Sequence, residues 1–307
     1  MAVTLVEAAK SSQNPLQSGV IELFARSQDI LRTLPFDNIE GNALRYNREE
    51  SLPGIGFRGV NEAYTESTGV INPLTEPLVI AGGDLDVDKF ILRTMGNGQR
   101  TTQEEMKVKA LSSRFVKAFI KGDNATEPRE FDGLQVRLTG SQKISAGSTS
   151  GGAALSLAKL DEAIDAVDEP THLVMNRTMR RRLSAAARST SVGGYITYDP
   201  DAFGRKVTMY NDLPILIVDQ DNTGTDIMQF NEAAAAGAST ATSIYVVSFM
   251  SGKLTGIQNG GIQVEDLGEL QSKPAFRTRV EWYPGIALWH PRAACRLYSI
   301  GDLAVVA

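Results

Sequence analysis

The stretch from residue 63 to residue 133 constrains the fold of this 307-residue chain more than any other. It opens with a polar segment, residues 63–83, in which Val, Ile and Leu recur, and it continues through the acidic run Gly-Gly-Asp-Leu-Asp-Val-Asp at residues 82–88. A helical pattern then extends from about Thr101 to Lys121. About twenty helical residues at 1.5 Å each span roughly 30 Å. The stretch therefore predicts a long helical strut that follows an extended segment.

Local signals predict where this helix starts and stops. Thr101 with Glu104 three residues later matches a capping box, and Gly122 is placed to end the helix in a left-handed cap. The apolar positions form one broad face that needs a partner. They are Met106, Ala110, Leu111, Phe115, Ala118 and Phe119.

Residues 40–80 predict a long two-stranded excursion. They are rich in glycine and polar residues, and apolar and polar side chains alternate through residues 43–48. An isolated hairpin is marginally stable in water. We therefore expect contacts from elsewhere, such as neighbouring subunits, to support it.

The rest of the chain mixes helices and strands without a regular βαβ rhythm, which predicts an α+β fold. Residues 15–34 have helical spacing and stop at Pro35. After residue 140 the patterns predict two helices, 155–167 and 177–188. The predicted strands are 173–175, 213–218, 244–249, 262–264 and a strand–turn–strand over 277–288.

Composition excludes several classes of protein. With 42% hydrophobic residues the chain can bury a substantial core, and a net charge of −5 argues against binding nucleic acid through overall charge. The single cysteine, Cys295, allows no intrachain disulfide and fits a reducing compartment. No stretch approaches the roughly 18 apolar residues of a membrane span. We therefore expect the protein to be made in the cytoplasm and not to associate with a membrane.

Two motifs invite a chemical interpretation. The loop at residues 147–152, Gly-Ser-Thr-Ser-Gly-Gly, could cradle a phosphate, but it lacks the P-loop ending and the dinucleotide spacing, so a flexible loop is favoured. Asp84, Asp86 and Asp88 share one face if the segment is a strand. The EF-hand glycine and glutamate are replaced by Lys89 and Met95, so a solvated acidic patch or an intersubunit ion-pair face is favoured over a metal site.

The remaining reactive side chains predict no active centre. His172 and His290 are too few for a histidine-rich metal site, and Cys295 lies in an apolar context that favours burial. The helical run Arg180-Arg181-Arg182 is interpreted as an exposed face or an intersubunit contact. We therefore predict no catalytic, cofactor-binding or metal-binding residues, no cofactor, and no enzymatic activity.

The order of these features resembles the Hong Kong phage-type fold of tailed-bacteriophage major capsid proteins. Each matching local sequence is weak alone, but their order and spacing agree. They are Gly122-Asp123, Phe131-Asp132-Gly133-Leu134, Leu173-Val174-Met175-Asn176, Asp212-Leu213-Pro214-Ile215-Leu216 and Pro291-Arg292-Ala293-Ala294.

The resemblance implies a division of the chain into five parts. It comprises an N-terminal arm (1–40), an extended β-hairpin loop (41–83), a peripheral domain (84–169) with a spine helix at 101–121, an axial domain (170–278) and return strands to the peripheral domain (279–307).

The resemblance also implies a function. The chain would be a structural subunit that self-assembles as hexamers and pentamers into an icosahedral viral head, part of the virion, assembled in the host cytoplasm. It would enclose double-stranded DNA without sequence-specific binding, and scaffold, portal and decoration proteins are possible partners. Some members cross-link through a lysine in the extended loop. This chain has no lysine between Lys10 and Lys89, which predicts a shell held by non-covalent contacts.

Two alternatives remain open from the sequence. The first is an encapsulin, a cellular compartment of the same fold that encloses cargo. The second is a cytoplasmic enzyme that binds a phosphorylated ligand at residues 147–152. The enzyme would require a compact molecule with a convergent polar pocket, which the long predicted loop argues against.

Overall fold

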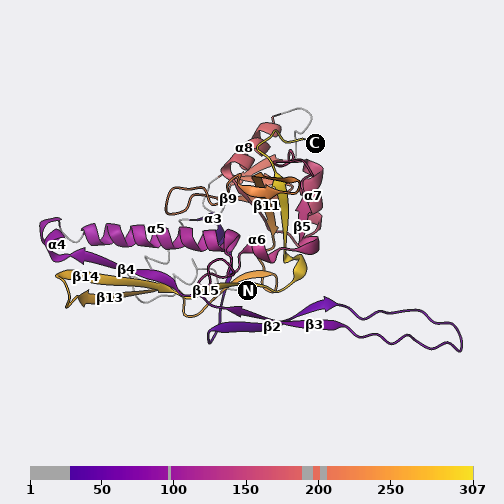
Figure 1. The fold of residues 1–307 in the computed structure, drawn as a ribbon, viewed down its shortest axis with the longest axis horizontal. Helices are drawn as coiled ribbons and strands as arrows, with labels where there is room; N and C mark the ends of the chain where they lie inside the picture. The colour runs from indigo at the N-terminus through magenta and orange to yellow at the C-terminus, as the bar shows by residue number, and fades with distance from the viewer. Residues whose placement is uncertain (1–27, 96–97, 189–195, 201–205, 307) are drawn as a thin grey trace.

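The computed structural model describes residues 28–95, 98–188, 196–200 and 206–306. Helices and strands are mixed, as the sequence predicts. Figure 1 shows an elongated body with one long helix, α5 (Gly98–Lys121), along one part and a strand-rich unit at the helix's C-terminal end. A two-stranded hairpin leaves the body below that unit and extends beyond it.

Helix α5 is the predicted spine helix, but it begins three residues earlier than expected. The capping-box prediction is therefore wrong, because Thr101 lies inside the helix. Glu104 instead accepts a hydrogen bond from Thr278 Oγ1 at 2.8 Å, which joins the helix to a strand beneath it, and one from Arg100 Nε at 3.2 Å within the helix. The Glu104 side chain therefore bonds to Thr278, which is distant in sequence, and not to the backbone at the start of the helix.

Gly122 ends the spine helix for a different reason from the one predicted. Its φ is not positive, and its amide continues the helical pattern by donating to the Ala118 carbonyl at 2.8 Å. A Cβ on Gly122 would lie 2.3 Å from the Phe131 carbonyl oxygen, and one on Gly133 would lie 2.4 Å from that of Ala118. Both glycines are required because the chain folds back tightly against the helix end.

An antiparallel three-stranded sheet lies along the spine helix. Its order is β13 (Gln263–Glu269), β14 (Ala275–Trp282) and β4 (Ala81–Asp88). Alternate residues of β14 are buried, and Trp282 reaches Phe115 of α5 with ring centroids 4.7 Å apart. The period-2 burial of the strand thus meets the apolar stripe of the helix.

The strand-rich unit is built on an eight-stranded sheet. Its path runs β5 (Lys143–Ser145), β16 (Ala294–Ile300), β11 (Gly237–Val247), β6 (His172–Asn176), β9 (Leu213–Val218), β8 (Lys206–Tyr210) and β7 (Ile196–Pro200), with β10 (Glu232–Ala234) paired to β11. Helices α7 (Leu157–Asp165) and α8 (Arg177–Ala186) pack on it. Strands β6 and β9 are parallel, and α8, β7 and β8 lie between them in sequence.

Smaller elements join these parts. A three-stranded sheet contains β1 (Phe36–Asn38), β12 (Leu254–Gln258) and β15 (Pro284–Leu288), and β2 (Ala43–Ser51) pairs with β3 (Val70–Pro77) as the predicted hairpin. The remaining elements are short. They are α3 (Asp29–Thr33), α4 (Lys89–Met95), α6 (Leu134–Arg137), η1 (Gly140–Gln142) and η2 (Pro291–Ala293).

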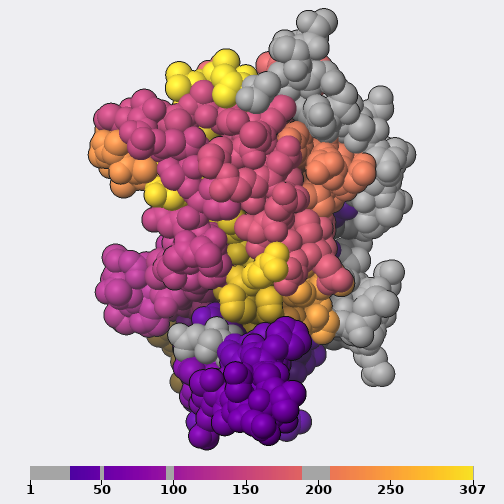
Figure 2. All heavy atoms as spheres, turned by 90° about the vertical axis from the view of Figure 1, so that its right-hand side faces the viewer, coloured from indigo at the N-terminus to yellow at the C-terminus, as the bar shows by residue number. Residues whose placement is uncertain are grey.

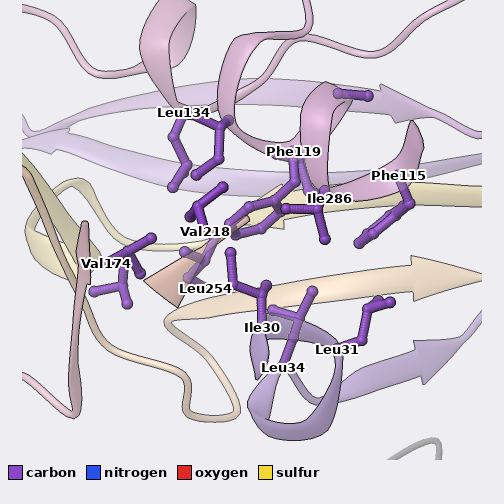
Figure 3. Close-up of a cluster of buried hydrophobic side chains, with 14 of the residues drawn as sticks. Ile30, Leu31, Leu34, Phe115, Phe119, Leu134, Val174, Val218, Leu254 and Ile286 are labelled. Atoms are coloured by element: carbon purple, nitrogen blue, oxygen red, sulfur yellow. The ribbon is translucent and has the colours of Figure 1, made fainter. Parts of the chain in front are cut away.

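Two large apolar cores correspond to the two parts of the body. The first gathers residues of α5, α3 and the adjacent strands, and Figure 3 shows Ile30, Leu31 and Leu34 pointing toward Phe115, Phe119 and Ile286. The second lies between the eight-stranded sheet and helices α7 and α8. Of the helix predicted over 15–34, residues 15–27 lie outside the described residues, and the described part ends before Pro35.

The pairing of strands cuts across the expected division of the chain. The expected boundary between residues 278 and 279 falls inside β14, and both β13 and β14 pair in the sheet beside α5. Helix α7, inside the expected peripheral range 84–169, contributes to the core of the eight-stranded sheet. Sequence order alone does not show these crossings, since they depend on long-range pairing.

Candidate assembly surfaces

Among the described residues, large exposed apolar side chains gather on the hairpin formed by β2 and β3 together with residues 52–69 that join them. Cross-strand pairs run from Ala43 with Pro77 to Ser51 with Val70, and the connection carries no further strand pairing. Figure 2, which looks toward the hairpin tip, shows it as a lobe beneath the body. The connection presents large apolar side chains that are 70% or more exposed, namely Leu52, Ile55, Phe57, Val60 and Tyr64.

Contacts within this connection give it local shape without burying it. The Ser67 hydroxyl donates to the Gly54 carbonyl at 2.9 Å, and the Gly59 amide donates to a Glu62 carboxylate oxygen at 2.8 Å. The Arg58 guanidinium lies 5.0 Å from the centroid of the Tyr64 ring. Several large apolar side chains exposed along one segment are typical of an interaction surface.

The root of the hairpin, at residues 42–46 and 76–79, is anchored by a third, small core. Tyr46 is buried together with Ile257 and Ala287, and its ring lies 4.8 Å from that of Trp289. The backbone continues the attachment, because Leu78 N donates to Asn42 O and Val79 N donates to Pro284 O. Burial and a nearby carboxylate raise the pKa of Tyr46 to about 12, so its hydroxyl stays protonated and can donate.

A groove of about 500 Å³ runs between β4 and α5. Its floor includes Leu111 and Phe115, and its rim carries Lys107 and an ion pair of Arg114 with Glu130. These side chains form an apolar channel with a charged edge. They do not form the convergent acid, base and nucleophile that hydrolytic or transfer chemistry requires.

The acidic run of β4 forms ion pairs within the chain. Arg277 Nε lies 2.6 Å from Asp86 and Arg279 Nε lies 2.7 Å from Asp84, both across the β4–β14 ladder. Hydrogen bonds from these guanidinium groups lower the pKa of each aspartate. The segment is a strand, so the shared face is as expected, and the arginine partners of Asp84 and Asp86 lie on β14 of the same chain. Asp88 accepts from the Phe90 amide at 2.7 Å and starts α4.

The arginine run of α8 is only partly exposed. The helix buries Met179 and Leu183, while Arg181 is exposed. Arg180 and Arg182 are half-buried, and Arg180 Nε is buried, so the predicted exposed face holds for Arg181 alone. Arg182 donates to Asp302 at 2.8 Å, which ties α8 to the C-terminal segment of the same chain.

The histidines and the cysteine have structural positions. His172 stacks against Phe249 at 5.4 Å, and burial lowers its pKa to about 4. His290 is exposed and accepts from the Arg292 amide at 3.1 Å. Cys295 is buried as predicted, and burial raises the pKa of its thiol to about 11.

The glycine-rich loop is an ordered turn. Gly152 has a φ of +105°, and a Cβ there would lie 2.6 Å from the Gly301 amide nitrogen. Residues 153 and 156 then bridge to the C-terminal segment before α7 begins at Leu157. A phosphate cradle needs a loop that leads directly into a helix N-terminus, and this turn does not.

The described residues also bear on metal sites and membrane spans. Among them, no group of three or more His, Cys, Asp or Glu side chains could hold a metal ion. No helix within that same part of the chain is long and apolar enough to cross a membrane.

Sequence reasoning missed two partly or fully buried ion pairs. Arg137 pairs with Glu76, and Arg296 pairs with Glu232. Their partners are 61 and 64 residues apart, so no local spacing links them. For Arg296 the available signal was an ionisable residue inside the apolar pattern of β16, which predicts a buried partner of opposite charge, whereas the pair of Arg137 with Glu76 has no such local signal.

The fold matches those of several known shell proteins. The SrpI encapsulin of Synechococcus elongatus aligns with a TM-score of 0.67 at 15% identity, covering 91% of this chain and 89% of that chain. A structure from Mycobacterium phage Adephagia gives 0.62 at 12% identity, with 90% of each chain covered. The capsid of the empty GTA particle gives 0.61 at 15% identity, covering 89% of this chain and 90% of that chain. The chain thus has the Hong Kong phage-type capsid fold.

Part of the sequence also matches a family model. Residues 12–159 match the family model of Major capsid protein GP7. No curated protein sequence matches the chain. The family match and the capsid neighbours confirm the resemblance to major capsid proteins and support a structural shell subunit.

Proposed function

We propose that this protein is the major subunit of an icosahedral phage capsid, assembling as hexamers and pentamers into a shell that encloses double-stranded DNA. One observation supports this most strongly: the apolar connection of the β2–β3 hairpin is exposed over 18 residues, 52–69, in the isolated chain. Burying one large apolar side chain stabilises a contact by about 1.5–3 kcal/mol. A closed shell repeats each such contact by symmetry, so modest contacts add up to a stable particle.

The shell is held by non-covalent contacts. The loop contains no lysine, because none occurs between Lys10 and Lys89. Scaffold, portal and decoration proteins are separate partners in this proposal, and the DNA is retained by enclosure. A net charge of −5 is consistent with a wall that does not grip its contents. Assembly takes place in the host cytoplasm, and the mature protein resides in the virion.

The parts of the chain take distinct roles in this shell. Residues 1–40 form the arm and 41–83 the extended loop. The peripheral domain is built on α5, and the axial domain is the unit around the eight-stranded sheet. The strand pairing supports an earlier return to the peripheral domain than residue 279, since β13 already pairs beside α5.

An encapsulin-type compartment is the second candidate, because SrpI encapsulin gives the TM-score of 0.67. The two candidates differ in their contents, which are DNA in one and cargo protein in the other. The family match to a major capsid protein favours the first.

The test compares the full chain with a variant in which residues 54–67 are replaced by a short flexible linker. After nuclease treatment and size-exclusion chromatography, electron microscopy should show closed shells for the full chain and only small oligomers for the variant. The unchanged body, measured by circular dichroism, is the control for folding. A denaturing gel of the shells should show the monomer band alone. Equal shell yield from both chains would remove the loop from the mechanism, and a monomeric full chain under every condition would overturn the function.

A further inference from the structure

One ion pair joins the extended loop to α6, in the segment that follows the spine helix. Arg137, the last residue of α6, makes two hydrogen bonds to Glu76 of β3, one of them from Nη2 to Oε2 at 2.6 Å. Their side chains are only 14% and 11% exposed. A bidentate guanidinium–carboxylate pair fixes the relative orientation of its two groups as well as their separation.

Both partners are anchored beyond the pair itself. Arg137 Nε donates to the Asp132 carbonyl at 2.6 Å, in the segment that folds back against the end of α5. On the other side, the Tyr46 hydroxyl lies 3.4 Å from Glu76 Oε1 and 3.0 Å from the Leu288 carbonyl oxygen, so its one proton is shared between these two acceptors. A single carboxylate thereby connects both strands of the hairpin to the body.

The hairpin does not need this connection to exist as a hairpin. Its two strands are paired from residue 43 to residue 77, and that ladder is independent of Arg137. Past the root, the connection at residues 52–69 is exposed and rests on no other element of the described chain. Its direction is therefore set at the root, where a small angular change moves the tip far.

A pair of this kind contributes orientation more than stability. Replacing a buried ion pair by apolar groups of similar size is often neutral or stabilising, because desolvation offsets the attraction. We propose that Arg137 and Glu76 are positioning residues that set the direction of the extended loop, so that its tip reaches the neighbouring subunit. The role in assembly rests on the proposed shell function; the orientation of the loop does not.

The orientation is tested by pulsed EPR on the full chain, kept below the concentration at which shells form. Spin labels are attached at Ala63→Cys in the loop and Ala185→Cys on α8, both exposed positions, while the buried Cys295 stays unlabelled. The double variant Arg137→Met/Glu76→Gln removes both charges. We expect its distance distribution to be at least about twice as broad as that of the parent, with an unchanged circular dichroism spectrum. An equally narrow distribution would overturn the proposal.

A matched control removes the same charges elsewhere. Lys159 and Glu162 form an exposed pair on α7, with side chains 43% and 51% exposed. Lys159→Met/Glu162→Gln should leave the distribution narrow, and broadening equal to that of the test variant would overturn the proposal. Arg137→Lys keeps the charge but cannot make the bidentate contact with Glu76, so it should broaden the distance distribution to a smaller extent. That variant decides the question if the double variant does not fold.

The assembly readout is independent. The concentration for half-maximal shell formation should rise about tenfold in the double variant, which corresponds to ~1.4 kcal/mol per subunit. An unchanged concentration would overturn the assembly role. If the parent chain forms no shells yet shows the narrow distribution, the shell function fails while the positioning of the loop stands.

Discussion

Removal of the buried Glu232 charge should destabilise the body of the subunit more than removal of a surface charge. Arg296 of β16 and Glu232 of β10 lie 2.9 Å apart with side chains 7% and 3% exposed. Arg296 also donates to Ser243 Oγ at 3.0 Å and to the Gln135 carbonyl at 3.3 Å, so it links the eight-stranded sheet to α6.

The magnitude follows from the burial. Breaking a buried pair by removing one charge costs about 3–5 kcal/mol, because the other charge stays buried without compensation. Glu232→Gln retains an oxygen that can accept one hydrogen bond, so the expected loss lies near ~3 kcal/mol. Each kcal/mol lowers the Tm of a domain of 150–250 residues by about 2–4 °C. The variant should therefore melt roughly 6 °C or more below the parent chain.

The assay is calorimetry or thermal fluorescence on the unassembled chain, so that subunit contacts do not contribute to the Tm. Asp302→Asn is the control, because Asp302 pairs with Arg182 at the surface, where side chains are 51% and 40% exposed. Exposed pairs contribute about 0–1 kcal/mol. Equal shifts in the two variants would refute the reasoning that burial of the Glu232 pair determines its importance.

Three further predictions follow from single sites. Gly122→Ala should destabilise the fold by about 3 kcal/mol, because its Cβ would lie 2.3 Å from the Phe131 carbonyl, whereas Gly56→Ala, in open space, should be neutral by denaturant titration. Burial lowers the pKa of His172 from 6.5 in the unfolded chain to about 4 in the folded chain. As the pH drops from about 6.5 to about 4, the unfolded state binds a proton that the folded state does not, so the free energy of unfolding should fall. His172→Gln should flatten this pH dependence. The Cys295 thiol, with a pKa of about 11, should resist alkylation at pH 8 until the chain unfolds, as followed by mass spectrometry.

The sequence predicted those features that depend on local periodicity. The spine helix was expected over 101–121 and occurs over 98–121, and the strand at 213–218 was placed correctly. The alternation at residues 43–48 identified the hairpin. Each of these signals lies within one element, where the pattern of apolar side chains reports directly on burial.

Features that depend on distant partners were not predicted. Glu104 matches a capping box locally, but Thr278 and Arg100 hold it in the structure. Gly122 looks like a left-handed cap, yet the approach of Phe131 is what excludes a side chain there. The loop-root pair of Arg137 with Glu76 has no local signature, because the fold alone brings α6 beside β3. Tertiary contact overrides local preference at these positions.

In the proposed shell, the extended loop of each subunit is covered by a neighbour through non-covalent contacts. A cryo-electron microscopy reconstruction of particles assembled from the full chain would show these contacts. We expect an icosahedral shell of pentamers and hexamers in which Ile55, Phe57 and Tyr64, all 70% or more exposed in the single chain, are buried against an adjacent subunit. Particles in which these side chains remain in solvent, or a chain that stays monomeric or dimeric under every assembly condition, would contradict it.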